Sequence, residues 1–198
     1  MLNRLISRFI NRQIEQGILK QEEREAYEYG YFLIALEILN ISVMAFIGIL
    51  FRCFLPLLFF TVCLILLRKY AGGIHASSYV RCAAVSAVLE LAVVSLLRTG
   101  LWQSLFLPAA LAAICGCAVI WRFSPVAATT KPLTEEETIR FRRTARRRLV
   151  AAAALAVLLF ALRLYLWAFI MMLDFIVIGG AMGVALYQTH RQRQDQGR

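Results

Sequence analysis

Residues 149–187 read LVAAAALAVLLFALRLYLWAFIMMLDFIVIGGAMGVALY, and only Arg163 and Asp174 in this segment carry a charge. A membrane-spanning helix needs about 20 apolar residues to cross the roughly 30 Å hydrocarbon core of a bilayer. The segment, about 40 residues long, is therefore too long for one crossing and suits two. Arg163, Tyr165 and Trp167 are residue types typical of the membrane–water interface, so they predict the turn between the two spans.

The composition of the whole chain supports a membrane protein. Of its 198 residues, 61% are hydrophobic and only 17% are charged. A soluble domain contains roughly 45 to 50% apolar residues. We therefore predict an all-α, polytopic membrane helical bundle.

Four further apolar segments precede residues 149–187. The spans that they predict are residues 31–51, 53–67, 80–97 and 101–121. The sequence thus predicts six spans. The predicted regions are an amphipathic N-terminal region (1–29), a six-span domain (30–188) with polar connections at 68–79 and 122–148, and a basic C-terminal tail (189–198).

The N-terminal region has the pattern of an amphipathic helix. Its apolar residues recur at helical spacing between Leu2 and Ile18, while Arg4, Arg8 and Arg12 repeat every fourth residue beside them. Such a helix either lies in the membrane interface or packs against its own protein, and the pattern alone does not separate these alternatives.

The positive charge of the chain is distributed unevenly. The formal net charge is +10, and 19 of the 22 Lys and Arg residues lie in the two terminal regions and the two polar connections when the first connection is counted through Arg81. The positive-inside rule then predicts a multi-pass membrane protein whose termini and long polar connections all lie in the cytosol. Because the cations lie between apolar segments, orientation in a bilayer explains them better than nucleic-acid binding does.

The most unusual polar stretch is residues 68–82, RKYAGGIHASSYVRC, which holds His75 and Cys82. A cysteine nucleophile needs a neighbouring base or imidazolium, and Arg68, Lys69 and Arg81 add positive potential that favours a thiolate. Seven residues of continuous helix would separate His75 from Cys82 by about 10.5 Å. The glycine pair at 72–73 permits a turn, so we expect His75 to fold back over the start of the third span.

Each of these residues also has a purely structural explanation. A single cysteine in a membrane helix often serves as a small apolar residue. Ser78, Cys82, Ser86 and Glu90 are spaced four apart, however, and form one polar stripe along a helix.

Three carboxylates, those of Glu37, Glu90 and Asp174, lie within the predicted spans, where ionisable groups are costly and are functional candidates. Glu90 either orients the site or pairs with a polar group such as Asn40. Asp174 is either functional or a partner of Arg163.

The sequence predicts neither a metal site nor a cofactor. The chain has five cysteines and two histidines, and no histidine accompanies the Cys115-Gly116-Cys117 sequence, which we interpret as packing. A Walker A loop for ATP is also absent from the sequence.

Two segments resemble the accessory gene regulator protein B (AgrB) family, membrane endopeptidases that process quorum-sensing propeptides in Gram-positive bacteria. Residues 68–76, RKYAGGIHA, followed by Cys82, are similar to the family block R-[RK]-Y-[AS]-G-G-x-H-A and its cysteine seven residues later. Residues 124–126 and 131–134, SPV and KPLT, are similar to a proline-valine and lysine-proline-leucine segment that follows the fourth span. Ile74 departs from the pattern, since an aromatic residue is frequent there.

The resemblance implies a cysteine endopeptidase (thiol protease) with His75 and Cys82 as the catalytic pair and Arg68 and Gly73 at positions needed for activity. It implies that Cys82 forms an acyl-thioester with a small propeptide, releases the C-terminal tail, and yields a cyclic thiolactone or lactone autoinducing peptide. Ser78 and Glu90 are the supporting residues that we add from the polar stripe.

The expected partners follow from the same resemblance. They are a propeptide with an amphipathic N-terminal helix and an acidic C-terminal tail, the lipid bilayer, and a second copy of the chain if a homodimer forms. Acidic substrate tails suggest that the cations of the 122–148 connection bind them: Lys131, Arg142, Arg143, Arg146 and Arg147.

Two other classes of function stay open at this point. One is a small membrane peptide transporter with Glu37, Glu90 and Asp174 along its path, and the other is a noncatalytic membrane scaffold. Replacement of Cys82 separates them, because a transporter should tolerate it and a cysteine peptidase should not.

Overall fold

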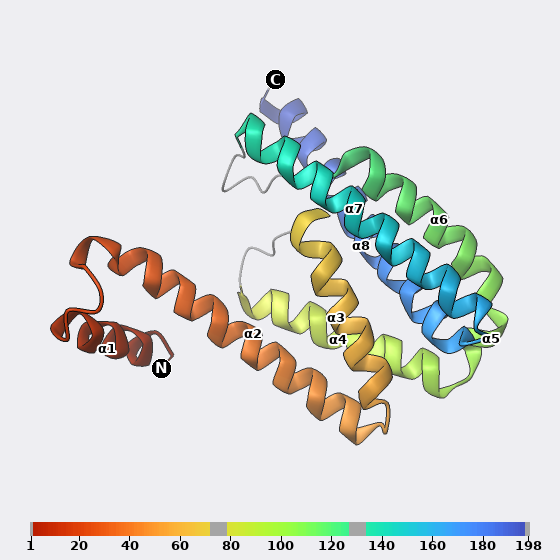
Figure 1. Cartoon of the computed structure of the whole chain (residues 1–198), viewed down its shortest axis with the longest axis horizontal. Coiled ribbons are helices and arrows are strands. Elements are labelled where there is room, and N and C mark those ends of the chain that lie inside the picture. The colour runs from red at the N-terminus through yellow and green to blue at the C-terminus, as the bar shows by residue number, and fades with distance from the viewer. Residues whose placement is uncertain (1, 72–78, 127–133, 197–198) are drawn as a thin grey trace.

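The computed structural model describes residues 2–71, 79–126 and 134–196. These residues form helices and no β-strand, which confirms the all-α prediction (Figure 1). The elements in chain order are α1 (Leu2–Glu15), the 3-10 turn η1 (Gln21–Glu23), α2 (Arg24–Leu50), α3 (Phe54–Ala71), α4 (Tyr79–Arg98), α5 (Leu101–Ser104), α6 (Phe106–Phe123), α7 (Glu135–Ala161) and α8 (Tyr165–Gln196).

Four segments in the described part of the chain are long and apolar enough to cross a bilayer. They are Gln21–Leu50, Phe54–Ala71, Phe106–Phe123 and Tyr165–Thr189. The protein is therefore a multi-pass helical membrane protein. The count of six spans, which would add α4 and α7, stays a prediction.

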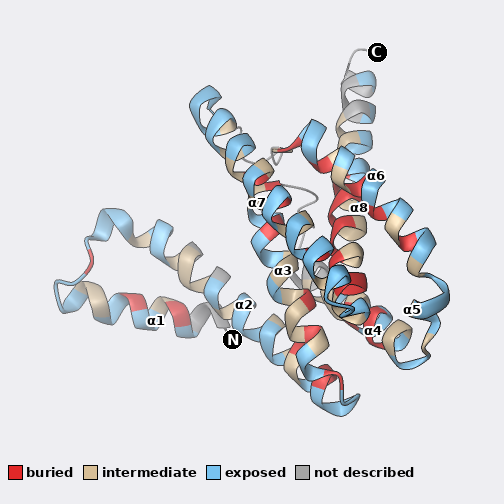
Figure 2. Ribbon diagram, turned by 45° about the vertical axis from the view of Figure 1, so that its right-hand side comes forward, coloured by how far each residue is buried: buried red, intermediate tan, exposed pale blue. Residues whose placement is uncertain are grey.

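The bundle is organised around α8, which packs against α3, α6 and α7. Phe175, Ile178 and Met182 of α8 form one buried cluster with residues of those helices. Ile170 of α8 belongs to a second cluster, with Met44 of α2 and residues of α3 and α4. Figure 2 shows that buried residues concentrate on α8, while the outer helices expose much of their surface. This pattern fits a bundle whose outer apolar faces are solvated by lipid.

The packing of α6 against α8 is close because both helices carry glycine at the crossing. A Cβ atom on Gly179 would lie 2.6 Å from the Cα atom of Gly116, and a Cβ on Gly116 would overlap the backbone carbonyl of Phe175. Small residues let helix backbones approach in membranes, where van der Waals packing drives association. The interpretation of Cys115-Gly116-Cys117 as packing therefore agrees with the contact that Gly116 makes.

The turns that end α2 and α7 share one geometry. Arg52 has φ 53° and Arg163 has φ 60°, so both lie in the left-handed region. After α7, the Arg163 N–H donates to the Phe160 carbonyl at 3.0 Å and the Leu164 N–H donates to the Leu159 carbonyl at 2.9 Å. This is the Schellman pattern that ends many helices. The hairpin predicted at Arg163 is confirmed.

Several helix boundaries differ from the sequence prediction. Helix α7 begins at Glu135, so half of the expected 122–148 connection is helical. Its start is fixed by a capping box, in which the Thr134 hydroxyl accepts from the Glu137 N–H and the Glu137 carboxylate accepts from the Thr134 N–H. Hydropathy marks the start of apolar residues rather than the start of a helix, so α7 begins before the span predicted from residue 149.

Three further elements show smaller differences. The expected fourth span divides at Leu105 into α5 and α6, helix α2 begins at Arg24 within a polar stretch, and α8 continues through most of the expected tail to Gln196. In each case hydropathy locates the membrane part of the chain without marking the helix ends.

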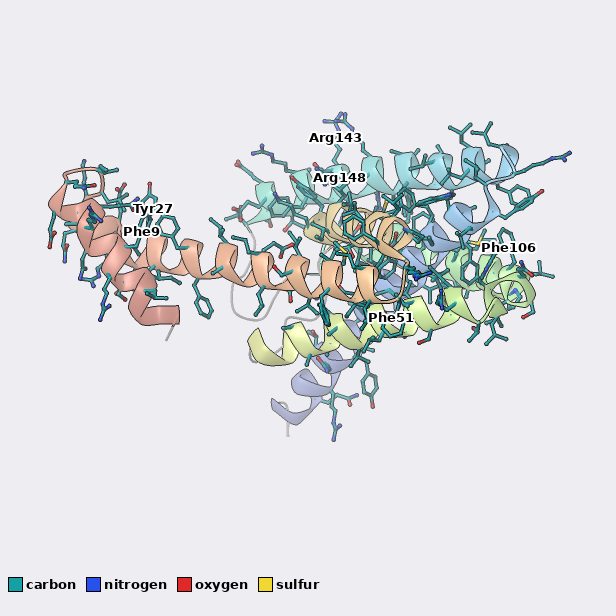
Figure 3. The ribbon with its side chains drawn as sticks, turned by 90° about the horizontal axis from the view of Figure 1, so that it is seen from below. Phe9, Tyr27, Phe51, Phe106, Arg143 and Arg148 are labelled. Atoms are coloured by element: carbon teal, nitrogen blue, oxygen red, sulfur yellow. The ribbon has the colours of Figure 1, made fainter. Side chains whose placement is uncertain are left out.

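Helix α1 packs against the N-terminal turns of α2, away from the rest of the bundle (Figures 1 and 3). Phe9 makes an edge-to-face contact with Tyr31 at 5.3 Å between ring centroids, and Ser7 donates a hydrogen bond to Glu28. Ile6 and Ile10 are buried, whereas Phe9 is 51% exposed. The helix therefore packs on its own protein and also leaves apolar surface free to meet a membrane interface.

Candidate functional site

Cys82 lies in the first turn of α4, near the helix start predicted at about residue 80. The side chain of Cys82 and all of His75, Gly73 and Ser78 lie outside the part of the structure that is described. The expected turn of His75 over the start of α4 therefore stays a prediction. Arg68 lies in the last turn of α3, with its side chain exposed.

The two segments that carry the AgrB resemblance meet at the end of α3. The Val126 N–H donates to the Ala71 carbonyl at 3.1 Å, which joins the residues after α6 to the last residue of α3. Ala71 is 1% exposed, and Ser124 is fully buried with its hydroxyl donating to the Ile120 carbonyl. The segment that contains His75 (residues 68–82, the His75 segment) is thus held at Ala71 against the segment that begins at Ser124 by a backbone hydrogen bond.

Helix α7 fastens the same end of α3 through an arginine. The Arg148 Nη1 donates to the Leu66 carbonyl at 2.7 Å, and its guanidinium lies 4.2 Å from the centroid of the Tyr70 ring. Tyr70 also packs edge-to-face against Phe141. Cations favour the carbonyl end of a helix, and guanidinium groups stack on aromatic rings. This role of Tyr70, Phe141 and Arg148 was not predicted from the sequence. The signals that could have indicated it are the run of arginines before residue 149 and the tyrosine near the end of α3.

The predicted arginines of the 122–148 connection line one open groove of about 530 Å³, which we call the arginine groove. Its basic residues are Arg142, Arg143, Arg146 and Arg147, and its apolar residues are Trp121, Ile139 and Val150. Lys131, the fifth predicted cation, lies outside the described residues. The structure therefore brings the four arginines together but leaves their ligand open.

Two of these arginines also hold α7 against the end of α6. The Arg142 Nε donates to the Ser124 carbonyl at 3.3 Å, and the Arg146 Nε donates to the Trp121 carbonyl at 3.2 Å. The Arg146 guanidinium lies 4.8 Å from the centroid of the Trp121 ring. In this way α7 contacts the C-terminal ends of both α3 and α6. The sequence predicts that these ends lie on the cytosolic side of the membrane.

Glu90 is buried on α4, with 6% of its surface exposed, and its Oε2 has no hydrogen-bond partner within the described residues. It lies eight residues after Cys82, or about 12 Å along the helix axis, which is too far for direct contact. Helix α4 packs against α2, the helix that carries Asn40. Any influence of Glu90 on Cys82 must therefore pass through other residues.

Asp174 is fully buried in the middle of α8, and neither carboxylate oxygen has a hydrogen-bond partner in the part of the chain that is described. Arg163 is exposed at the hairpin before α8, and the helix rise from the start of α8 at Tyr165 to Asp174 is already about 13.5 Å. The alternative that Asp174 pairs with Arg163 is therefore wrong. The two residues belong to one apolar segment of the sequence, but one lies exposed in the turn and the other is buried inside the bundle.

The carboxylates that would line a transport path do not share one environment. Glu37 is exposed on α2, whereas Glu90 and Asp174 are buried on α4 and α8. Among the residues that the structure describes, no group of three His, Cys, Asp or Glu side chains is placed to hold a metal ion.

The family model described as Accessory gene regulator B matches residues 3–184 of this chain. The chain belongs to this family. The curated proteins include an AgrB-like protein of Clostridium perfringens (strain SM101, type A) that is 23% identical over 141 residues, covering 69% of this chain. The match spans 64% of that relative's own length. No solved structure matches the chain.

The AgrB family match covers both segments joined by the Val126–Ala71 hydrogen bond. The matched region therefore contains the end of α3, Cys82 in α4 and the start of α7. The protein is a membrane protein of the accessory gene regulator system.

Proposed function

We propose that this protein is a membrane cysteine endopeptidase that cleaves a small quorum-sensing propeptide and cyclises the retained part. The observation that carries the proposal is the backbone hydrogen bond between Val126 and Ala71, because it joins the two AgrB-like segments immediately before the residues that include His75. Cys82 follows in the first turn of α4.

The proposed chemistry has two linked acyl transfers. His75 takes the Cys82 thiol proton, the thiolate attacks the scissile carbonyl, and the protonated His75 gives its proton to the departing amine of the C-terminal tail. This leaves an acyl-thioester on Cys82. A thiol or hydroxyl of the retained peptide then attacks that thioester, giving a thiolactone or lactone and returning the proton to the Cys82 sulfur.

The position of Cys82 in the first turn of α4 suits this chemistry. The N-terminus of a helix carries partial positive charge, which favours a thiolate and the oxyanion that forms during acyl transfer. We propose that backbone N–H groups of this first turn donate to the oxyanion. Glu90, two turns deeper, acts as a positioning residue in this scheme.

The acidic tail of the propeptide would meet a strongly basic surface. We propose that Lys131 and the arginines of the groove attract the tail from a distance, because the field of a charge cluster does not require direct contact. The proposal places this surface, the His75 segment and both termini in the cytosol, as the distribution of cations predicts.

The test is reconstitution of the full chain in liposomes with a candidate propeptide, followed by mass spectrometry of both fragments. Cys82→Ala and His75→Ala should each reduce cleavage by at least about a thousandfold, since loss of a nucleophile or base removes covalent catalysis. Cys115→Ala is the matched control, because Cys115 is an exposed cysteine on α6 and should be dispensable. Full cleavage by the Cys82→Ala variant would exclude Cys82 as the nucleophile. Movement of the intact propeptide across the liposome membrane without any cleavage would instead favour the transporter.

A further inference from the structure

The arginine groove faces away from α3, the helix that precedes His75 in the sequence. Phe141, Arg148 and Leu149 lie on the face of α7 that packs against α3 or the core cluster. Arg143, Arg147 and Val150 fall on the opposite side at 100° per residue, and all three are exposed. Figure 3 shows Arg143 projecting away from the bundle, whereas Arg148 lies close to it. A ligand in the groove is therefore separated from α3 by the body of α7.

The basic part of the groove has guanidinium groups already held in place. Arg142 and Arg146 each use Nε to donate to a backbone carbonyl at the end of α6, which leaves their terminal nitrogens as donors. Arg143 and Arg147 are one helical turn apart and make no hydrogen bond or ion pair with the described residues. Four guanidinium groups around one groove suit a phosphate group, which accepts bidentate hydrogen bonds from arginine.

The apolar part of the groove points to an amphiphilic ligand. Val150 is 55% exposed, and it lies at the start of the apolar half of α7, which continues with exposed residues such as Val157. Trp121 is 46% exposed and lies near the C-terminal end of the apolar helix α6, and tryptophan is typical of the membrane interface. An acidic peptide tail would leave the apolar lining of the groove uncovered. A lipid, in contrast, carries acyl chains below its phosphate, and these chains would contact that lining.

We propose that the arginine groove binds the headgroup phosphate of an anionic phospholipid, with the acyl chains against Val150 and the lower part of α7. Basic pockets at the ends of membrane helices recognise anionic lipid headgroups in this way. The bound lipid would bridge α6 and α7, because Arg146 and Trp121 come from different helices. This inference does not depend on the catalytic proposal.

The experiment measures lipid retention by the purified full-length protein. Native mass spectrometry in detergent, after addition of phosphatidylglycerol or phosphatidylcholine at equal concentration, should show preferential binding of phosphatidylglycerol. Arg143→Gln with Arg147→Gln should weaken this binding by about thirtyfold. The matched control is Arg122→Gln with Arg140→Gln, which removes the same charge from exposed arginines outside the groove and should leave binding unchanged. Circular dichroism should show equal helix content in all variants.

Three results would overturn the proposal. The first is equal phosphatidylglycerol binding by the Arg143→Gln/Arg147→Gln variant and the control variant. The second is displacement of the lipid by inorganic phosphate at the same concentration, because the apolar wall would then contribute nothing. The third is more effective displacement of the bound lipid by a hexaglutamate peptide than by phosphatidylglycerol that is added in a mixture with phosphatidylcholine. That result would assign the groove to an acidic peptide instead.

Discussion

Gly116 shows how a single missing methyl group sets the distance between two helices. We expect Gly116→Ala to destabilise the protein by about 1 to 3 kcal/mol, because the added Cβ overlaps the backbone of α8 and a packed interface must separate to admit it. The measurement is the midpoint of unfolding as sodium dodecyl sulfate is added to protein in mixed micelles, followed by circular dichroism.

Gly180→Ala is the matched control for this change. No atom lies within 4 Å of a Cβ built on Gly180, and alanine favours a helix more than glycine does. The control should therefore be as stable as the parent protein or slightly more so. Equal stability of the two alanine variants would contradict the close α6–α8 crossing.

For individual residues, the sequence indicated which ones were unusual, but it did not indicate how deeply they are buried or which residues they contact. The interpretation of Cys115-Gly116-Cys117 as packing agrees with the structure at Gly116, where the backbone of α8 lies too close for a side chain. The link between Arg163 and Asp174 failed, since a sequence does not show how deeply each residue is buried. The contact of Arg148 with Tyr70 was also missed, because it joins residues far apart in the chain.

Among the elements, the hairpin between α7 and α8 makes a specific prediction. Arg163 adopts a left-handed conformation that costs an ordinary side chain roughly 1 to 2 kcal/mol, and glycine adopts it freely. We expect Arg163→Gly to be more stable than Arg163→Ala by about 1 kcal/mol in the same unfolding assay. Both variants lose the guanidinium group, so their difference isolates the backbone conformation.

The opposite order of stability would argue against this turn. Arg52 at the end of α2 has the same conformation, so the glycine and alanine pair at that position provides an independent repeat.

The existence of the helices was predictable from hydropathy, but their ends were not. The capping box at Thr134 and the glutamates after it are local signals for the start of α7 that precede its apolar half. Pro56 and Pro108 each lie in the first turn of a helix, α3 and α6, where proline is tolerated. Reading Pro108 in this way would have placed the start of α6 correctly.

For the whole molecule, the uneven distribution of cations predicts the orientation in the membrane. In a cysteine-free background, single cysteines introduced at Thr130, next to His75 and near the C-terminus should react only with reagents that reach the cytosol. A cysteine at Arg163 should react from the opposite side, because this residue is exposed in the α7–α8 turn. Labelling of position 130 from outside the cell would contradict this orientation.

The proposed attraction of the propeptide tail makes a prediction about salt. In liposomes of phosphatidylcholine alone, which add no net charge, rising salt should raise the apparent KM, since the Debye length falls from about 10 Å at 0.1 M to about 3 Å at 1 M. Arg143→Gln with Arg147→Gln should raise the KM at low salt by about two- to tenfold and flatten its salt dependence, with less effect on kcat. These positions are chosen because Arg142 and Arg146 also hold α7 to α6.

An unchanged salt dependence in this variant would show that the arginines serve only to orient the protein and to bind lipid. The Arg122→Gln/Arg140→Gln variant gives the comparison for a general loss of positive charge.

The hydrogen bond from Val126 to Ala71 joins main-chain atoms only, so it does not depend on the chemical identity of either side chain. At position 126 this bond excludes only proline, because proline alone lacks the backbone N–H that donates. Position 71 is constrained by volume, since its side chain is buried where α3 ends. Members of the family could therefore diverge at position 126, and at position 71 among small residues, and still keep the two segments joined. A saturation screen at position 126 should show proline as the distinctive gap.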